Sequence, residues 1–202
     1  MRSFSLFLGL AALLAGPCFP QAKVQATDIV NHPFSVHFVP QGRLDLRVRS
    51  GDVRVVGTDQ ATISVDLSGS SVDDARTRGL KVVFENKDGD AKMRISGGPK
   101  DGLTITVKIP AKTDLRARIP FGEVVVENVQ GNKDVSLHAG DLTVEVGDRA
   151  AYSRVDAFVF TGEVDAAAFD ESHGGLFRSF HHDGQGTHRL HAHVGAGQIT
   201  LR

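Results

Sequence analysis

A short pattern built around a glycine occurs five times in this chain and restricts the folds that it can adopt. Each copy has an aliphatic residue three positions before the glycine, an acid or amide directly after it, and small or aliphatic residues two and four positions after it. The copies are VRSGDVRV (48–55), IPFGEVVV (119–126), LHAGDLTV (137–144), VFTGEVDA (159–166) and VGAGQITL (194–201). Since strand side chains alternate and glycine permits a positive φ, the pattern predicts a corner between two strands.

The spacing of the copies favours a solenoid corner over a hairpin turn. A hairpin turn and a solenoid corner would both fit a single copy. The glycines lie at 51, 122, 140, 162 and 197, which gives intervals of 71, 18, 22 and 35 residues. A degraded copy near Gly174-Gly175-Leu176 could fill the last interval. A repeat of roughly 20 residues is typical of a coiling β-architecture, so we expect a β-solenoid over residues 115–202.

The rest of the chain also reads as strands. Aliphatic residues alternate with polar ones most clearly in LTITVKI (103–109), as expected of strands with one buried and one solvent-exposed face. Only SVDDARTRG (71–79) is helix-like, with Ser71 as a possible cap. We therefore predict an all-β, single-domain, right-handed β-helix-like solenoid over residues 30–202, with a strand-rich N-terminal part and at most one short helix.

The N-terminus has the features of a secretory signal. Arg2 precedes an apolar run over residues 4–14 that is too short to span a bilayer. We predict a signal peptide over residues 1–22, with cleavage after Ala22 or after Ala26. The single cysteine, Cys18, follows Pro17 rather than the small residue that a lipoprotein signal needs, so lipid anchoring is the less favoured alternative. The expected location is periplasmic or extracellular, with no transmembrane segment in the mature chain.

The composition argues against two classes of ligand. The formal net charge is −1 without a charge block, so no nucleic-acid partner is expected. Twelve of the thirteen aromatic residues are Phe, and there is no Trp. This weakens, without excluding, a sugar-binding platform of the usual Trp or Tyr type.

Three passages resemble a known family. They are RLDLRVRSGDVRVVG near the predicted mature start, TITVKIPAKTDLRARIPFGEVVVENVQG, and the SGDV and AGDL corners. Together they are similar to the bacterial putative-adhesin family, whose members are exported domains of unknown function with a β-helical body. The resemblance covers residues 35–202. It implies a strand that ends in a proline and leads into the glycine-cornered rungs, and it brings no catalytic residues with it.

Six of the nine histidines fall in the last thirty residues. They are His173, His181, His182, His188, His191 and His193. Clustered imidazoles can bind zinc or copper, and His191 and His193 share one strand face with a spacing of about 7 Å. Leu190, Ala192 and Val194 alternate with these histidines and are expected to face the core. The favoured interpretation is therefore that His191 and His193 lie on a solvated polar face. A metal site would need a third ligand, such as His181 or His182.

Two charged patterns allow similar alternatives. The acids after the corner glycines, Asp52, Glu123, Asp141 and Glu163, could stack into a calcium-binding ladder, although turn chemistry explains them adequately. Five outward arginines could form an anion-binding stripe, although the interspersed acids Asp45, Asp52, Asp66 and Asp114 favour ordinary mixed surface charge. The arginines are Arg47, Arg49, Arg54, Arg116 and Arg118.

No catalytic motif accompanies the repeat. The sequence lacks a nucleophile elbow, an HExxH helix and a phosphate loop, and the adjacent Asp73 and Asp74 are better explained by a helix start. We expect no catalytic, cofactor or metal residues. The leading hypothesis is an exported, non-enzymatic, adhesin-like or envelope interaction module with an unknown envelope or extracellular macromolecule as its partner. The alternatives are a carbohydrate-active β-helix enzyme and a periplasmic metal-binding protein that uses the C-terminal histidines.

Overall fold

One β-sheet contains all the strands that the structure describes. In the computed structural model, residues 22–49 and 51–202 are described, and they form a 14-stranded sheet. The strands are β1 (Ala22–Thr27), β2 (Phe34–His37), β3 (Arg43–Val48), β4 (Asp52–Thr58), β5 (Thr62–Ser68), β6 (Lys81–Lys87), β7 (Asp90–Ser96), β8 (Thr104–Pro110), β9 (Asp114–Phe121), β10 (Val124–Glu127), β11 (Lys133–Val144), β12 (Tyr152–Ala166), β13 (Glu171–Asp183) and β14 (His188–Leu201). The same described ranges also contain one short helix, α1 (Ala75–Arg78), and the 3₁₀ turns η1 (Arg149–Ala151) and η2 (Ala167–Phe169).

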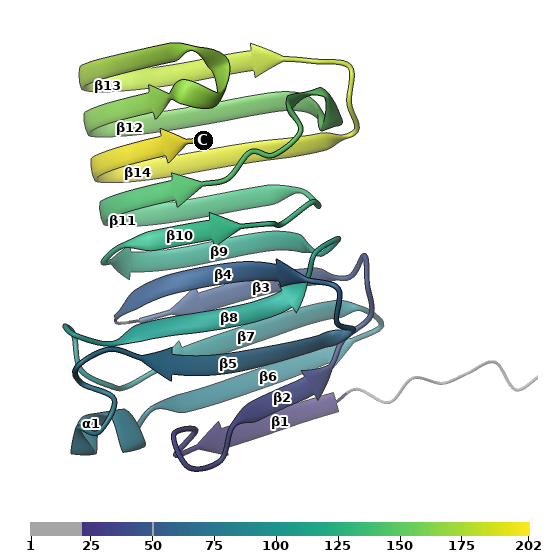
Figure 1. Ribbon diagram of the computed structural model, residues 1–202, viewed down its shortest axis with the longest axis vertical. Coiled ribbons are helices and arrows are strands. Elements are labelled where there is room, and N and C mark those ends of the chain that lie inside the picture. Colours follow the sequence, from purple (N-terminus) through teal and green to yellow (C-terminus); the bar gives the residue numbers. More distant parts are fainter. Residues whose placement is uncertain (1–21, 50) are drawn as a thin grey trace, which may run out of the picture.

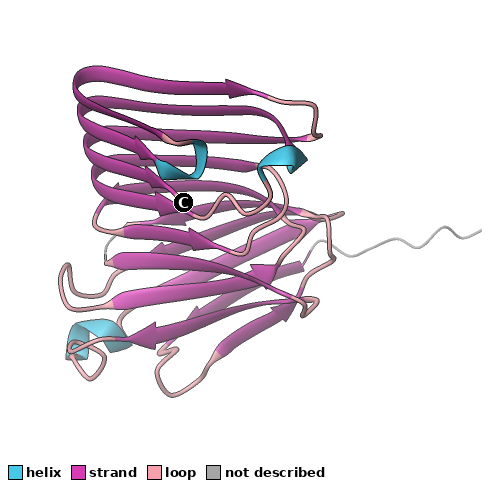
Figure 2. Cartoon of the chain, turned by 45° about the horizontal axis from the view of Figure 1, so that its top comes forward, coloured by secondary structure: helices cyan, strands magenta, loops and turns pink. Residues whose placement is uncertain are grey.

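The sheet folds over on itself into two layers that face each other (Figures 1 and 2). Layer A contains β1, β6, β7, β3 and β9, and layer B contains β2, β5, β8, β4 and β10. The long strands β11, β14, β12 and β13 bend at the corner and contribute one arm to each layer, as β11 does by pairing with β9 and then with β10. The layers are packed against each other, as the rings of Phe34 and Phe84 show at a centroid distance of 6.3 Å.

The glycine corners lie directly on top of one another. All five glycines have a positive φ, between 86° and 139°. A Cβ built on Gly140 would lie 2.1 Å from the carbonyl oxygen of Gly122, and one on Gly197 would lie 1.9 Å from that of Gly140. No side chain fits at such distances, so glycine is required by the close approach of the rungs as well as by φ. The predicted corners are confirmed.

The aliphatic positions of the repeat form the core. Val48, Ile119, Leu137, Val159 and Val194, each three residues before a corner, are at most 3% exposed, and the residues two and four after it are equally buried. In register, Val124 lies between Val53 and Leu142. The core is thus a set of aliphatic columns that run through the stacked rungs, and its side chains belong to one continuous cluster.

The all-β prediction is confirmed, but the structure does not show the predicted right-handed solenoid. The rungs do not follow one another in chain order, because β14 lies between β11 and β12. The outermost strand, β13, runs antiparallel to β12, and Gly175 of the degraded copy pairs there with Gly162. The sheet also begins at Ala22, before residue 30. A regular solenoid would have parallel rungs in sequential order.

The short helix is confirmed, although its cap is a different residue. The carboxylate of Asp74 accepts a hydrogen bond from the amide of Arg76 at 2.8 Å, whereas the hydroxyl of Ser71 donates to the carbonyl of Asp101. This amide bond is the main reason why the pKa of Asp74 is lowered. In the described part of the chain, no helix has the length and apolar character needed to cross a bilayer.

Candidate functional site

The outer face of layer A carries a row of charged and imidazole side chains that runs across nine strands. Each residue is in register with the next one on the neighbouring strand. This charge row consists of Lys23, Glu85, Lys92, Asp45, Arg116, Asp134, His191, Asp156 and His181, in that spatial order. Basic groups or imidazoles alternate with carboxylates throughout. Cross-strand neighbours of opposite charge stabilise a sheet, so the row is favourable for the fold.

Several neighbours in the charge row form ion pairs. Lys23 lies 2.8 Å from Glu85, and Arg116 lies 3.1 Å from Asp134. These pairs are exposed, so each contributes little to stability by itself. Their effect is to fix the side chains in a regular array rather than to add much free energy of folding.

His181 is held between two carboxylates at one end of the row. Its Nδ1 lies 2.8 Å from Asp156 and its Nε2 lies 2.9 Å from Asp183. Hydrogen bonds to Asp183 and Asp156 raise the pKa of His181, because both ring nitrogens donate only in the imidazolium form. Burial alone would raise the pKa of Asp156, but hydrogen bonds from Arg154 and His181 outweigh it and lower that pKa.

The other predicted histidines are spread over different places. His191 and His193 lie on the outer face of layer A while Leu190, Ala192 and Val194 are buried, which confirms the predicted parity. His182 packs on the ring of Phe169 at 4.7 Å, and His188 lines a pocket. The side chain of His173 lies outside the described residues. Among the side chains that the structure describes, no three His, Cys, Asp or Glu residues are arranged to hold a metal ion.

A second row, next to the charge row, is basic. Arg94, Arg47 and Arg118 lie side by side on β7, β3 and β9, and Ser136 and His193 continue the row on β11 and β14. We call these five residues the basic row. Asp45 accepts from Arg47 at 3.3 Å and from Arg118 at 3.4 Å, so one carboxylate serves two guanidinium groups. The basic stripe considered from the sequence therefore exists in part, with Arg94 as an additional member.

Exposed aromatic residues stand beside the basic row, near the corners. Phe121 is 60% exposed and Phe160 is 50% exposed. Phe121 meets His138 edge to face at 5.7 Å, and Phe158 stacks on His193 at 5.4 Å.

The acids after the corner glycines do stand in adjacent rungs, as their spacing suggested. Gln198 interrupts their ladder, because it lies in register between Asp141 and Glu163. At the other end, the carboxylate of Asp52 accepts a hydrogen bond from the amide of Glu123 at 3.0 Å. This contact supports the interpretation of these acids as turn residues.

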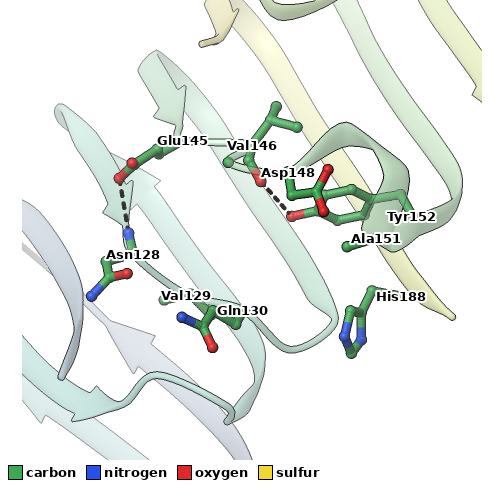
Figure 3. A pocket seen from close by; sticks show the side chains of 10 residues that line it. Asn128, Val129, Gln130, Glu145, Val146, Asp148, Ala151, Tyr152 and His188 are labelled. Atoms are coloured by element: carbon green, nitrogen blue, oxygen red, sulfur yellow. Dashed lines mark hydrogen bonds between the residues drawn. The ribbon is translucent and has the colours of Figure 1, made fainter. Parts of the chain in front are cut away.

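A pocket of about 350 Å³ opens between the loops on the side away from the corners (Figure 3). Its lining includes Asn128, Glu145, Asp148, Tyr152 and His188. The polar groups nearest to it are largely engaged with the protein itself. Glu145 accepts from the amide of Asn128 at 2.9 Å, and the hydroxyl of Tyr152 donates to the carbonyl of Val146 at 3.0 Å.

Behind this pocket lies a buried lysine that the sequence reasoning missed. Lys133 is 1% exposed, its ammonium donates to the hydroxyl of Tyr152, and it lies 4.9 Å from the centre of the tyrosine ring. Burial lowers the pKa of Lys133 to about 8, against an opposing effect of Glu145, and burial raises the pKa of Tyr152 to about 12. The sequence could have revealed Lys133, because it shares one face of the strand with Val135 and Leu137, and that face is the buried one.

The structure was also compared with known proteins. No family model matches the chain, and no curated protein matches it. A solved structure of a putative cell adhesion protein from Clostridium sporogenes ATCC 15579 is similar over 90% of this chain and 99% of that one, with 16% identity and a TM-score of 0.46. A putative adhesin from Bacteroides fragilis NCTC 9343 is similar over 90% of this chain and 97% of that one, with 9% identity and a TM-score of 0.31. At these values the two structures support no conclusion about this chain.

Proposed function

We propose that the protein is an exported, non-enzymatic, adhesin-like module that binds an envelope or extracellular macromolecule through the outer face of layer A. The observation that carries the proposal is the pair of parallel rows on this face, one alternating in charge and one basic, flanked by exposed phenyl rings. A broad surface with fixed charges and apolar contacts suits recognition of a large partner.

The rigidity of the face supports this role. Its strands are hydrogen-bonded to their neighbours, and many of its charged side chains are already held in pairs, as Arg116 is by Asp134. A side chain that is ordered before binding loses less conformational entropy when the partner arrives. The partner therefore meets a surface that needs little rearrangement.

Export requires the predicted signal peptide, and the fold favours one of the two predicted cleavage positions. β1 runs from Ala22 to Thr27 and pairs with β6, with Val24 opposite Phe84. Cleavage after Ala26 would remove all of this strand except Thr27, whereas cleavage after Ala22 would remove only its first residue. We propose cleavage after Ala22, and N-terminal sequencing of the exported protein tests it.

Binding of the purified, fluorescently labelled protein to intact cells of the producing organism tests the binding role. Arg47→Glu with Arg118→Glu reverses two charges on layer A. The matched control, Arg54→Glu with Lys108→Glu, reverses two charges on layer B that also sit in ion pairs, with Glu127 and Asp66. We expect the first double variant to lose most of its cell binding and the second to keep it. Equal binding by both variants would contradict the assignment to layer A.

A further inference from the structure

From the geometry of the basic row we infer that layer A holds a binding site for an acidic polysaccharide, whose carboxylate or sulfate groups meet the arginines and whose sugar rings lie against the adjacent aromatic side chains. This inference rests on the proposed binding role and names the chemistry of the partner. The proposed site lies where the basic row approaches the corners, and it is separate from the pocket lined by Tyr152 and His188.

A shallow hollow gives the site its shape. It measures about 310 Å³, and its lining includes Arg118, Pro120, Ser136, His138 and His193. Gly195 on β14 also lines it, and a Cβ there would lie 2.4 Å from the carbonyl oxygen of His138, so two rungs approach closely at this point. All of its lining residues belong to β9, β11 and β14, so the hollow does not depend on the conformation of a loop.

The charge of the hollow and its surroundings suits an anion. Arg47 and Arg118 share the single carboxylate of Asp45. Within the described residues, Arg94 is exposed on the same face and forms no salt bridge, although after Lys23 it also contributes to lowering the pKa of Glu85 in the charge row. Arg49 lies at the corner, where it lines a separate hollow together with Asp52 and Asp101. Of the three guanidinium groups in the basic row, two therefore share one carboxylate and the third is in no ion pair. Guanidinium groups bind carboxylate and sulfate oxygens through charge-assisted hydrogen bonds, which are stronger than neutral ones.

The spacing of the basic row suits an extended polymer better than a single ion. Arg94, Arg118 and His193 lie on every second strand, on β7, β9 and β14. Two strand spacings amount to roughly 9.5 Å. This is close to the length of one disaccharide in an extended sugar chain, so a chain that crosses the strands could present one acidic sugar to each of the three positions.

The aromatic side chains indicate a sugar rather than a plain polyanion. Phe158 stacks on His193, and the half-exposed ring of Phe160 stands nearby on the same strand. Such rings offer apolar surfaces to the C–H faces of pyranose rings, while Ser136 and the imidazoles offer hydrogen bonds to hydroxyl groups. The site reaches this combination without Trp. A flat bilayer surface could not enter the hollow, whereas a single polymer chain fits it.

Titration calorimetry of the purified protein with defined polymers tests the inference. The probes are polygalacturonate for carboxylates and dextran sulfate for sulfates, with neutral dextran and phosphatidylglycerol vesicles as comparisons. Arg118→Gln removes a charge from the basic row. Arg54→Gln is its matched control, because it removes the same charge from an ion-paired arginine on the outer face of layer B, where it lies 3.2 Å from Glu127.

The expected result is saturable binding of polygalacturonate or dextran sulfate that weakens with added salt, together with a loss of about fivefold in affinity for Arg118→Gln and less than about twofold for Arg54→Gln. The polymer that binds identifies the acidic group. Arg47→Gln, at a fully outward position in the same row, serves as the second variant if Arg118→Gln does not fold.

Four results would overturn the inference. They are equal affinity losses in Arg118→Gln and Arg54→Gln, equal binding of neutral dextran, binding to the vesicles alone, and no binding to any probe. The last outcome leaves the cell-binding experiment unaffected, because that experiment does not depend on the chemistry of the partner. Failure of the polysaccharide assignment and failure of the proposed role can therefore be told apart.

Discussion

Replacing the buried Lys133 by methionine should remove a specific pH dependence of stability. The ammonium of Lys133 is held in the core between aliphatic neighbours, with Leu115 and Leu190 in register on either side. The difference between its ordinary pKa of 10.5 and a pKa of about 8 in the fold, at about 1.4 kcal/mol per pKa unit, corresponds to a cost of about 3 kcal/mol for keeping the charge buried.

The sign of the pH effect follows from proton linkage. Below pH 8 both the folded and the unfolded chain hold the proton, and the full cost is present. Between pH 8 and 10.5 the unfolded chain binds more protons than the folded one, so stability rises with pH. The pKa of Tyr152, raised to about 12, acts in the opposite direction only above pH 10, where the unfolded phenol begins to ionise. The raised pKa of His181 also affects stability near pH 7, but equally in the wild type and in Lys133→Met, so the difference between the two from pH 7 to pH 10 isolates Lys133.

Urea unfolding of the purified protein between pH 7 and pH 10 measures this effect. Relative to Lys133→Met, the wild type should gain about 2–3 kcal/mol of unfolding free energy over this range. At pH 7 the variant should be more stable than the wild type by about 2 kcal/mol. Removing the buried charge saves about 3 kcal/mol, and losing the hydrogen bond to Tyr152 costs about 1 kcal/mol of this gain. Lys92→Met, at an exposed position, is the control and should follow the wild type. Parallel curves for the wild type and Lys133→Met would refute the reasoning.

Two further predictions concern the corners and the charge row. Gly140→Val should destabilise the protein by more than about 3 kcal/mol in thermal or urea melts, since the backbone of Gly122 leaves no room for a side chain, while Asp141→Ala should cost less than about 1 kcal/mol. Comparable losses for the two variants would contradict the corner geometry. In an NMR titration, His181 should have a pKa above 6.5 that falls in Asp156→Asn, and an unchanged value in that variant would argue against their contact.

The corners could be predicted because their causes are local. A glycine at position 140 with aliphatic residues at 137, 142 and 144 specifies both the bend and the buried face, and the structure has both. The order of the rungs could not be predicted in this way. Each rung presents the same glycine and the same aliphatic columns to its neighbours, so the motif does not distinguish β14 from β12 as the neighbour of β11.

The candidate surface was predictable only in part. Alternation placed Arg47, Arg118 and His193 on the solvent side, and that is where they lie. Their assembly into one row depends on the register of strands that are far apart in the chain, as when Arg94 meets Arg47. The hollow at Gly195 depends on the same long-range register. Lys133, in contrast, stood at a core parity that could have been noticed from the sequence.

The position of β14 has a consequence for how the molecule forms. β11 and β12 are made before β14, but they are joined only through β14, which lies between them and pairs with both along most of its length. Until β14 is in place, β11 and β12 each have an unpaired strand edge, and the antiparallel pair of β12 and β13 has no attachment to the rest of the sheet. The sheet therefore depends on a strand made after β11, β12 and β13, which we expect to make folding slow and to leave a partly synthesised chain prone to association.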